Sequence, residues 1–211
     1  MAYSKLVRSA ELPYHVVNRC LDKEFYPVSL DKCWEQLMFL CHTITCIYGA
    51  RIHAFVLMSN HYHMLVSTPD ANLDDCMQYF QREFSLWMKE RTAKQRYRFQ
   101  GRYRSCLIYE ERHFLNVYRY IYQNPMRAGV VKKAEDYPFS SLHGRVGKSV
   151  LKFPIWPSAH LLGGALPESL EDEVEFINNR VAGDEVERTR RALGRRNFRP
   201  AARLAPSTKK I

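Results

Sequence analysis

The spacing of apolar residues predicts four short β-strands. Residues 13–20 are rich in β-forming side chains and predict the first strand. Two strand-like apolar runs within residues 51–67 flank Ser59 and Asn60, which is typical of a β-hairpin. Residues 104–109 are a fourth candidate strand.

Apolar residues at helical spacing indicate three further segments. The first helix is expected at residues 29–48, where Gly49 stops it, and the second at residues 73–91. The third is expected at residues 110–123 and ends near Pro125, because proline disfavours helical conformation in the residue before it.

The order of these segments is β-α-β-β-α-β followed by a helix. It predicts an α+β fold of the ferredoxin-like type, with one antiparallel sheet and both intervening helices on one face. The other face is left for a ligand or for the added helix, which carries several tyrosines.

Charge divides the chain further. The 211 residues include 32 Lys and Arg against 22 Asp and Glu, a net charge of +10. Residues 187–211 hold nine basic residues and one acidic residue, whereas residues 168–187 hold eight acidic residues and one arginine. We therefore expect a folded domain at residues 1–145, an extension with an acidic segment at residues 146–187, and a flexible basic tail at residues 188–211. The total charge favours a nucleic-acid partner without indicating any chemistry.

Several classes of protein are disfavoured. No apolar run approaches the length of a membrane span, and residues 1–5 are not followed by the apolar core of an export signal. The six cysteines contain no C-x-x-C pair, so they suggest neither a zinc finger nor a disulfide framework. We expect a cytoplasmic protein with reduced thiols and no membrane partner.

His61 and His63 are the first candidate for chemistry. Alternate side chains of a strand face the same way, so the two imidazoles project together, roughly 6.5–7 Å apart at the backbone. Such a pair can ligate one metal ion. The alternative is two ordinary polar residues on an exposed strand face.

The tyrosine-bearing helix supplies the second candidate. Tyr120 and Asn124 are four residues apart and share a helix face, with Gln123 as a near alternative to Asn124. Tyr118 and Tyr122 lie on other faces and are expected to pack in the core. A metal held by the histidines and an amide oxygen would orient a phosphodiester for attack by Tyr120. This is the chemistry of covalent phosphotyrosine formation.

In combination these motifs resemble the REP-associated tyrosine transposases, relatives of the HUH single-tyrosine transposases. The resemblance covers about residues 10–145. It is carried by Tyr14–Arg19, Met58–Val66, Gln100–Tyr103, Tyr120–Val131 and Asp136–Ser141. Ser59 departs from the family pattern, which often has proline there. The acidic segment and the basic tail have no clear counterpart in the family.

The resemblance implies that residues 1–145 are a catalytic domain with Tyr120 as nucleophile. It also implies that His61, His63 and Asn124 bind Mg²⁺ or Mn²⁺, although imidazole more often favours later transition metals. The implied partner is single-stranded and hairpin DNA from palindromic repeats. Whether the protein acts as a monomer or a homodimer is left open.

Candidate DNA contacts are cations interleaved with aromatic residues, which can hold phosphates and stack on bases. They are Arg19, Lys89, Arg96, Arg98, Arg102, Tyr103, Arg104 and Arg127. The alternative for the segment between the second helix and the fourth strand is a solvated basic loop. Arg127 could equally be a cation at a helix end.

We therefore hypothesise an enzyme that cleaves and rejoins single-stranded or hairpin DNA through a 5′-phosphotyrosine. Two other functions remain open at this point. One is a non-catalytic module that binds hairpin DNA or RNA on its sheet, and the other is a metal phosphodiesterase that uses water as the nucleophile.

Overall fold

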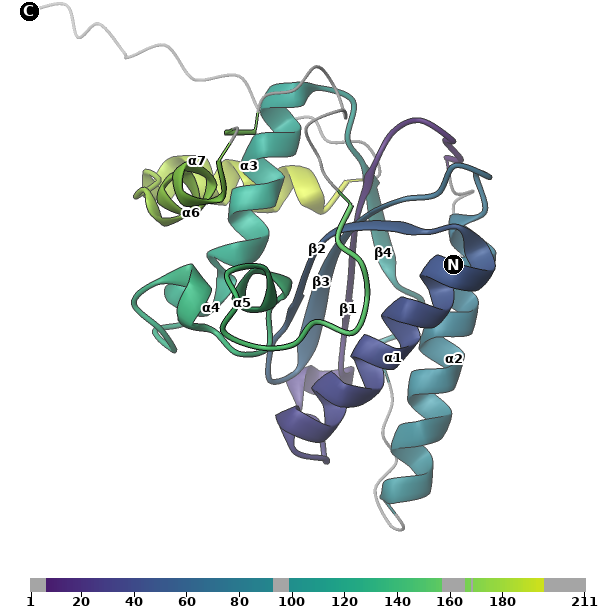
Figure 1. Ribbon diagram of the computed structural model, residues 1–211. Coiled ribbons are helices and arrows are strands. Elements are labelled where there is room, and N and C mark those ends of the chain that lie inside the picture. Colours follow the sequence, from purple (N-terminus) through teal and green to yellow (C-terminus); the bar gives the residue numbers. More distant parts are fainter. Residues whose placement is uncertain (1–6, 93–98, 157–165, 168, 196–211) are drawn as a thin grey trace, which may run out of the picture.

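The computed structural model describes residues 7–92, 99–156, 166–167 and 169–195. Within these ranges, strands form an antiparallel sheet in the order β2-β3-β1-β4 (Figure 1). The strands are β1 (Tyr14–Arg19), β2 (Arg51–Leu57), β3 (His61–Ser67) and β4 (Arg104–Leu107). This order confirms the ferredoxin-like sheet expected from the sequence.

Helices cover both faces of the sheet (Figure 1). The first two, α1 (Leu30–Tyr48) and α2 (Leu73–Arg91), pack together on one face. Phe55, Tyr62 and Phe80 lie in the core between these helices and the sheet. No helix in the described ranges is both long and apolar enough to cross a membrane.

The third helix, α3 (Glu111–Tyr122), lies across the opposite face. Val56 and Leu65 of the sheet pack there in a second core with Val117 and Ile121 of the helix. Successive strand residues point to opposite faces, so the same strands serve both cores.

A tight hairpin sets the start of β3. The backbone N–H of Met58 donates to the carbonyl of His61 at 2.8 Å, and the carbonyl of Asn60 accepts from Cys20 N–H at 2.9 Å. The hairpin predicted at Ser59 and Asn60 is therefore present, and it places His61 at the first position of the strand.

Helical structure continues beyond the predicted end of the third helix. A short helix, α4 (Asn124–Arg127), follows after Gln123 and carries Pro125 in its first turn. Proline is tolerated there because the first N–H groups of a helix have no partner within it. Two short helices follow, η2 (Ala134–Asp136) and α5 (Ser141–Arg145).

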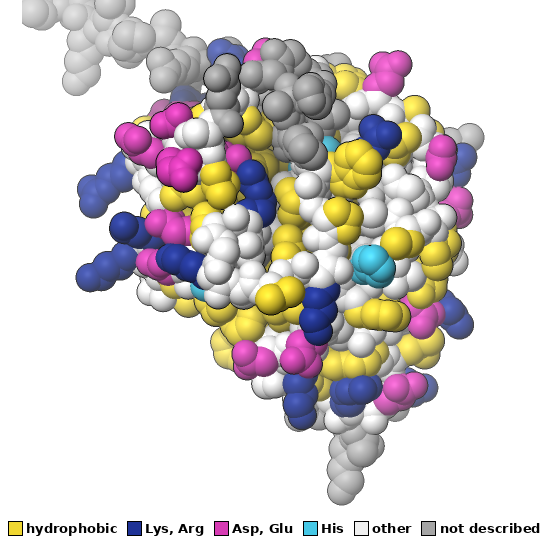
Figure 2. Space-filling view, in the orientation of Figure 1, with side chains coloured by type: hydrophobic (Ala, Val, Ile, Leu, Met, Phe, Trp, Pro, Cys, Tyr) yellow, Lys and Arg dark blue, Asp and Glu magenta, His cyan; other side chains and the backbone are white. Residues whose placement is uncertain are grey.

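The C-terminal part differs from expectation. The acidic segment contains a helix, α6 (Leu170–Asn178), and a second helix, α7 (Gly183–Leu193), spans the boundary placed at residue 188. Residues 188–193 are therefore helical rather than a flexible tail, because Thr189, Ala192 and Leu193 are buried. Residues 196–211 lie outside the described ranges. Side chains of both charge signs gather over α6 and α7 (Figure 2).

A buried carboxylate fastens the extension to the sheet domain. Glu173 of α6 is only 5% exposed and accepts a hydrogen bond from the Tyr118 hydroxyl of α3 at 2.5 Å. Its other oxygen accepts from Arg145 Nη2 of α5 at 2.8 Å. The network joins α3, α5 and α6, so α6 of the extension packs against the sheet domain.

We predict that Arg145→Met destabilises the protein by about 3–5 kcal/mol, because it leaves the Glu173 carboxylate buried without its cation. The double variant with Glu173→Met should recover much of that loss. Urea denaturation followed by circular dichroism measures both free energies of unfolding. A loss below about 1 kcal/mol in the single variant would contradict a buried ion pair.

Candidate nucleophile and metal-binding site

The two histidines of β3 lie on the α3 face of the sheet. His61 pairs with Arg19 of β1 and His63 pairs with Val17, so these side chains share one face. The ring centroids of His61 and His63 are 5.0 Å apart, with the ring planes nearly perpendicular at 81°. The structure thus places the two imidazoles together, as the alternation of strand residues predicts.

Helix α3 brings Tyr120 to this pair. Val117 and Ile121 anchor the helix in the core, and the neighbouring face turns Tyr120 toward His63, with 5.8 Å between ring centroids. Among the described residues, the Tyr120 hydroxyl has no hydrogen-bond partner. Tyr118 and Tyr122 are buried on the other side of the helix, and their hydroxyls are engaged.

Asn124 and Gln123 differ in the hydrogen bonds that their side-chain amides make within the protein. Gln123 donates to the carbonyls of Ile177 at 2.6 Å and Asn179 at 2.9 Å, and its oxygen accepts from Arg127. Both ends of the Gln123 amide are occupied.

The nitrogen of the Asn124 amide donates to the carbonyls of Tyr120 at 3.0 Å and Ile121 at 3.2 Å, which directs its oxygen away from those groups. Within the described ranges Asn124 makes no hydrogen bond with His61 or His63. Of the two amides, that of Asn124 has the oxygen available to a metal ion.

In both His61 and His63, one ring nitrogen is within hydrogen-bond distance of another side chain of the protein. His61 Nδ1 lies 2.7 Å from Asn60 Oδ1, and His63 Nδ1 lies 2.9 Å from His15 Nε2. The opposite nitrogen of His63, Nε2, is buried without a partner in the described part of the chain. An unsatisfied buried nitrogen is costly unless a ligand occupies it.

These residues fit a divalent cation. Burial lowers the pKa of His61 to about 4 and holds the pKa of His63 well below its ordinary value, so both rings are neutral at neutral pH. Neutral imidazole is the form that binds metals. The described residues contain no group of three or more His, Cys, Asp or Glu side chains placed to hold one metal ion, so further oxygen ligands would come from an amide such as Asn124 or from DNA.

The phenol of Tyr120 remains protonated at neutral pH. Burial raises the pKa of Tyr120, and the positive charges of Arg127 and Arg190 oppose that rise. The Arg127 guanidinium lies 4.4 Å from the centroid of the Tyr120 ring and donates to the Tyr120 carbonyl. Arg127 is thus the helix-end cation that the sequence suggested, and it also makes a cation–π contact with the Tyr120 ring.

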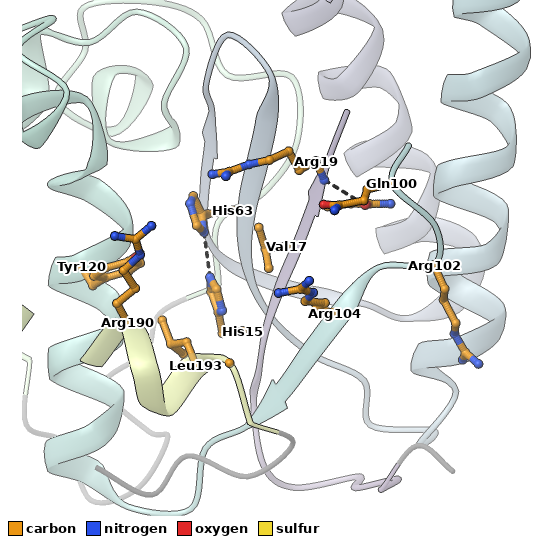
Figure 3. A pocket seen from close by; sticks show the side chains of 12 residues that line it. His15, Val17, Arg19, His63, Gln100, Arg102, Arg104, Tyr120, Arg190 and Leu193 are labelled. Carbon is orange, nitrogen blue, oxygen red and sulfur yellow. Dashed lines mark hydrogen bonds between the residues drawn. The ribbon is translucent and has the colours of Figure 1, made fainter. Parts of the chain in front are cut away.

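A polar cleft of about 260 Å³ opens beside Tyr120 (Figure 3). Arg19 reaches across it toward His63, while the Arg102 side chain points away from Tyr120. The lining side chains include Arg19, Gln100, Arg104 and Arg190. A cleft with several guanidinium groups is suited to phosphate oxygens.

The other predicted DNA contacts are placed differently. Tyr103 is 7% exposed and packs in the core, and the Arg102 guanidinium lies 5.1 Å from the centroid of its ring. Lys89 lies on α2, on the far side of the sheet from Tyr120. Arg96 and Arg98 lie outside the described ranges.

Sequence reasoning missed two residues of the cleft. His15 was not among the candidate site residues, although it shares the strand face of Arg19 by simple alternation. Arg190 was assigned to the flexible tail, although apolar residues at helical spacing from Val186 to Leu193 could have indicated α7.

The model of the IS200-like transposase family matches residues 8–124, more than half of the chain. The chain belongs to the IS200-like transposase family. The match includes the whole sheet, both histidines and Tyr120, and it ends at Asn124. The resemblance found in the motifs is therefore confirmed at the level of the family.

Two relatives extend this assignment. A Haemophilus influenzae protein named as a REP-associated tyrosine transposase is 29% identical over 101 residues, which are 43% of this chain and 57% of that protein. A solved REP-associated tyrosine transposase bound to a REP hairpin aligns with a TM-score of 0.56 and 16% identity. That alignment covers 80% of this chain and all of the solved chain, and it shows a shared fold.

Buried neutral histidines predict acid sensitivity. Burial lowers the pKa of His15 to about 3 and that of His53 to about 4. As the pH falls below about 6.5 the unfolded chain takes up protons that the folded protein does not, so each such group removes about 1.4 kcal/mol of stability per pH unit.

The measurement is urea denaturation of the metal-free protein at about pH 7 and about pH 5. We expect a lower free energy of unfolding at the lower pH. The variant His53→Gln should show a smaller difference between the two pH values, because it lacks the contribution of one buried histidine. Equal stability at the two pH values would show that the histidines are not held neutral.

Proposed function

We propose that this transposase cleaves and rejoins single-stranded or hairpin DNA with Tyr120 as nucleophile and a divalent metal as cofactor. The observation that carries the proposal is Tyr120 beside His63, whose buried Nε2 has no partner in the described structure, at the edge of an arginine-lined cleft. A hairpin substrate is supported by the solved relative, which holds a REP hairpin.

His61, His63 and the Asn124 amide oxygen would hold Mg²⁺ or Mn²⁺. A bound ion of this kind neutralises phosphate charge and polarises the phosphodiester. The donor set of two neutral imidazoles and an amide has no net charge. The positive charge of the ion would therefore remain available to the substrate.

Tyr120 performs the displacement. Its Oη forms a bond to phosphorus while the bond from phosphorus to the 3′ oxygen breaks. The phenol loses its proton as the new bond forms, and the leaving oxygen gains one to become a 3′-hydroxyl. The phosphotyrosine preserves the energy of the phosphodiester, so attack by a 3′-hydroxyl reverses the step and rejoins the strand.

Arg127 prepares Tyr120 for this step. The guanidinium over the ring restricts the ring's rotation, and its charge stabilises negative charge developing on Oη. Because Tyr120 and both histidines come from one chain, no second copy is needed to assemble these residues.

The cleft arginines would hold the DNA backbone. Arg19 and Arg104 project from adjacent strands, and Arg190 projects from α7 on the other side of the cleft. Phosphates bound between them would lie beside Tyr120. Arg190 lies beyond residue 124, so the extension would contribute to substrate binding.

We predict a metal-dependent covalent adduct. Incubating the protein with labelled hairpin DNA carrying a single-stranded flank and Mg²⁺ or Mn²⁺ should give a species that survives denaturation and gel electrophoresis. Tyr120→Phe should abolish the adduct, because the phenyl ring lacks the nucleophilic oxygen.

Tyr109→Phe is the matched control, because Tyr109 is 41% exposed and does not line the cleft. An adduct that persists in Tyr120→Phe would refute the assignment of the nucleophile. DNA cleavage without any adduct would indicate that water is the nucleophile, and binding without cleavage would indicate a non-catalytic module.

A second prediction separates Arg190 from its neighbour. Arg190→Ala should weaken hairpin DNA binding about 10-fold and lower the slope of log affinity against log salt by about one, because one phosphate contact is lost. Arg191→Ala should have a smaller effect, since both arginines pair with Glu187 but Arg191 does not line the cleft. Fluorescence anisotropy over a salt series measures both, and equal effects would contradict the role of Arg190.

A further inference from the structure

The two candidate metal ligands share a pattern in the hydrogen bonds that hold them. In each ring Nδ1 makes a hydrogen bond with another side chain of the protein, so Nε2 is the nitrogen available to a ligand. We propose that His15 is a positioning residue that holds His63 with Nε2 unprotonated, as Asn60 does for His61. This inference rests on the proposed metal site and names the groups that prepare it.

The orientation of Asn60 fixes the tautomer of His61. The amide nitrogen of Asn60 donates to the carbonyl of Lys23 at 2.7 Å, so the amide oxygen is the atom that faces His61. An amide oxygen only accepts, so His61 must donate from Nδ1. A neutral ring with its proton on Nδ1 carries a lone pair on Nε2, the form that a metal ion requires.

For His63 the partner is another imidazole, so the direction of the hydrogen bond is not set by atom type alone. Either His63 Nδ1 donates to His15 Nε2, or the reverse. The first arrangement leaves a lone pair on His63 Nε2, and the second leaves a buried N–H there.

Nearby charge selects the first arrangement. The guanidinium groups of Arg19 and Arg127 both act on His63, and Arg19 reaches the ring from the side opposite to His15 (Figure 3). A lone pair directed at cations is favourable, whereas an N–H directed at them is repelled. His63 therefore donates through Nδ1, and His15 accepts.

Packing holds the pair in this orientation. His15 and His63 are 2% and 5% exposed, and their hydrogen-bonded rings are nearly parallel, with centroids 5.1 Å apart and planes inclined by 23°. The Tyr120 ring meets both rings edge-on, at 6.4 Å from His15 and 5.8 Å from His63. Rotation of the His63 ring would break the hydrogen bond and collide with these neighbours, so the ligand nitrogen keeps one direction. Second-layer hydrogen bonds of this kind raise metal affinity about 10–100-fold.

The tautomers can be read directly in the metal-free full chain. Long-range ¹H–¹⁵N correlation spectra of the imidazoles distinguish Nδ1–H from Nε2–H rings. We expect both His61 and His63 to be Nδ1–H tautomers. A His63 ring protonated on Nε2 in the wild-type protein would overturn the proposal.

Three variants test the dependence on His15. His15→Leu removes the acceptor and should lower Mn²⁺ affinity about 10–100-fold, with His63 losing its single tautomer. His15→Gln keeps an acceptor oxygen and should retain affinity within about 3-fold of wild type. His53→Leu is the matched control, because His53 is equally buried but bonds to Ser67 and the Trp156 carbonyl instead.

Mn²⁺ affinity is measured by electron paramagnetic resonance of the free ion, without DNA. Unchanged affinity and an unchanged His63 tautomer in His15→Leu would overturn the proposal, as would equal losses in His15→Leu and His53→Leu. Failure of the proposed function looks different: the wild-type protein would bind no Mn²⁺ or form no adduct. The wild-type tautomer of His63 and its dependence on His15 would still decide the role of His15.

Discussion

Side chains on successive residues of a β-strand point to opposite faces, and this two-residue repeat governs both the core and the candidate site. One face of β1 and β3 carries Tyr14 and Tyr62 into the core under α1 and α2. The other face carries His15, His61 and His63 toward α3. A shift of register by one residue would bury the imidazoles among aromatic rings and expose the core. The apolar packing on one face therefore fixes the position of the polar chemistry on the other.

Electrostatics divides the site into two zones. The imidazoles are neutral because burial opposes their protonation, and they lie among guanidinium groups that would repel a charged ring. His63 also lines the cleft beside Tyr120, which gathers Arg19, Arg104 and Arg190. An anionic strand is attracted to the arginines of the cleft, while a cation finds lone pairs at the histidines and the Asn124 amide. A phosphate group and a metal cation could therefore bind next to each other, because the phosphate is held by the arginines and the cation by the histidines.

Much of the fold was predictable because its signals are local. The hairpin, the helices at residues 29–48 and 73–91 and the shared face of His61 and His63 all follow from spacing along the chain. The hydrogen bond between His15 and His63 could not be predicted, since it joins residues 48 apart through strand pairing. The position of α7 was missed because its packing on α3 is a tertiary contact that its arginine-rich composition conceals. The burial of Tyr103 was likewise not predictable from its cationic sequence neighbours, because its ring packs in the core through tertiary contacts.

The Glu173 network has a consequence for where this protein can be divided. Helix α3 presents Tyr120 to the cleft on one side, and on the other side it is tied through Tyr118 to α6. A chain shortened at residue 145 would keep every residue of the family match and lose the contact of Glu173 with the helix that carries Tyr120. The smallest unit that preserves the active geometry is thus longer than the smallest unit that can be recognised by sequence. Truncations, domain fusions and chimaeras of this enzyme should keep the chain intact to at least the end of α7.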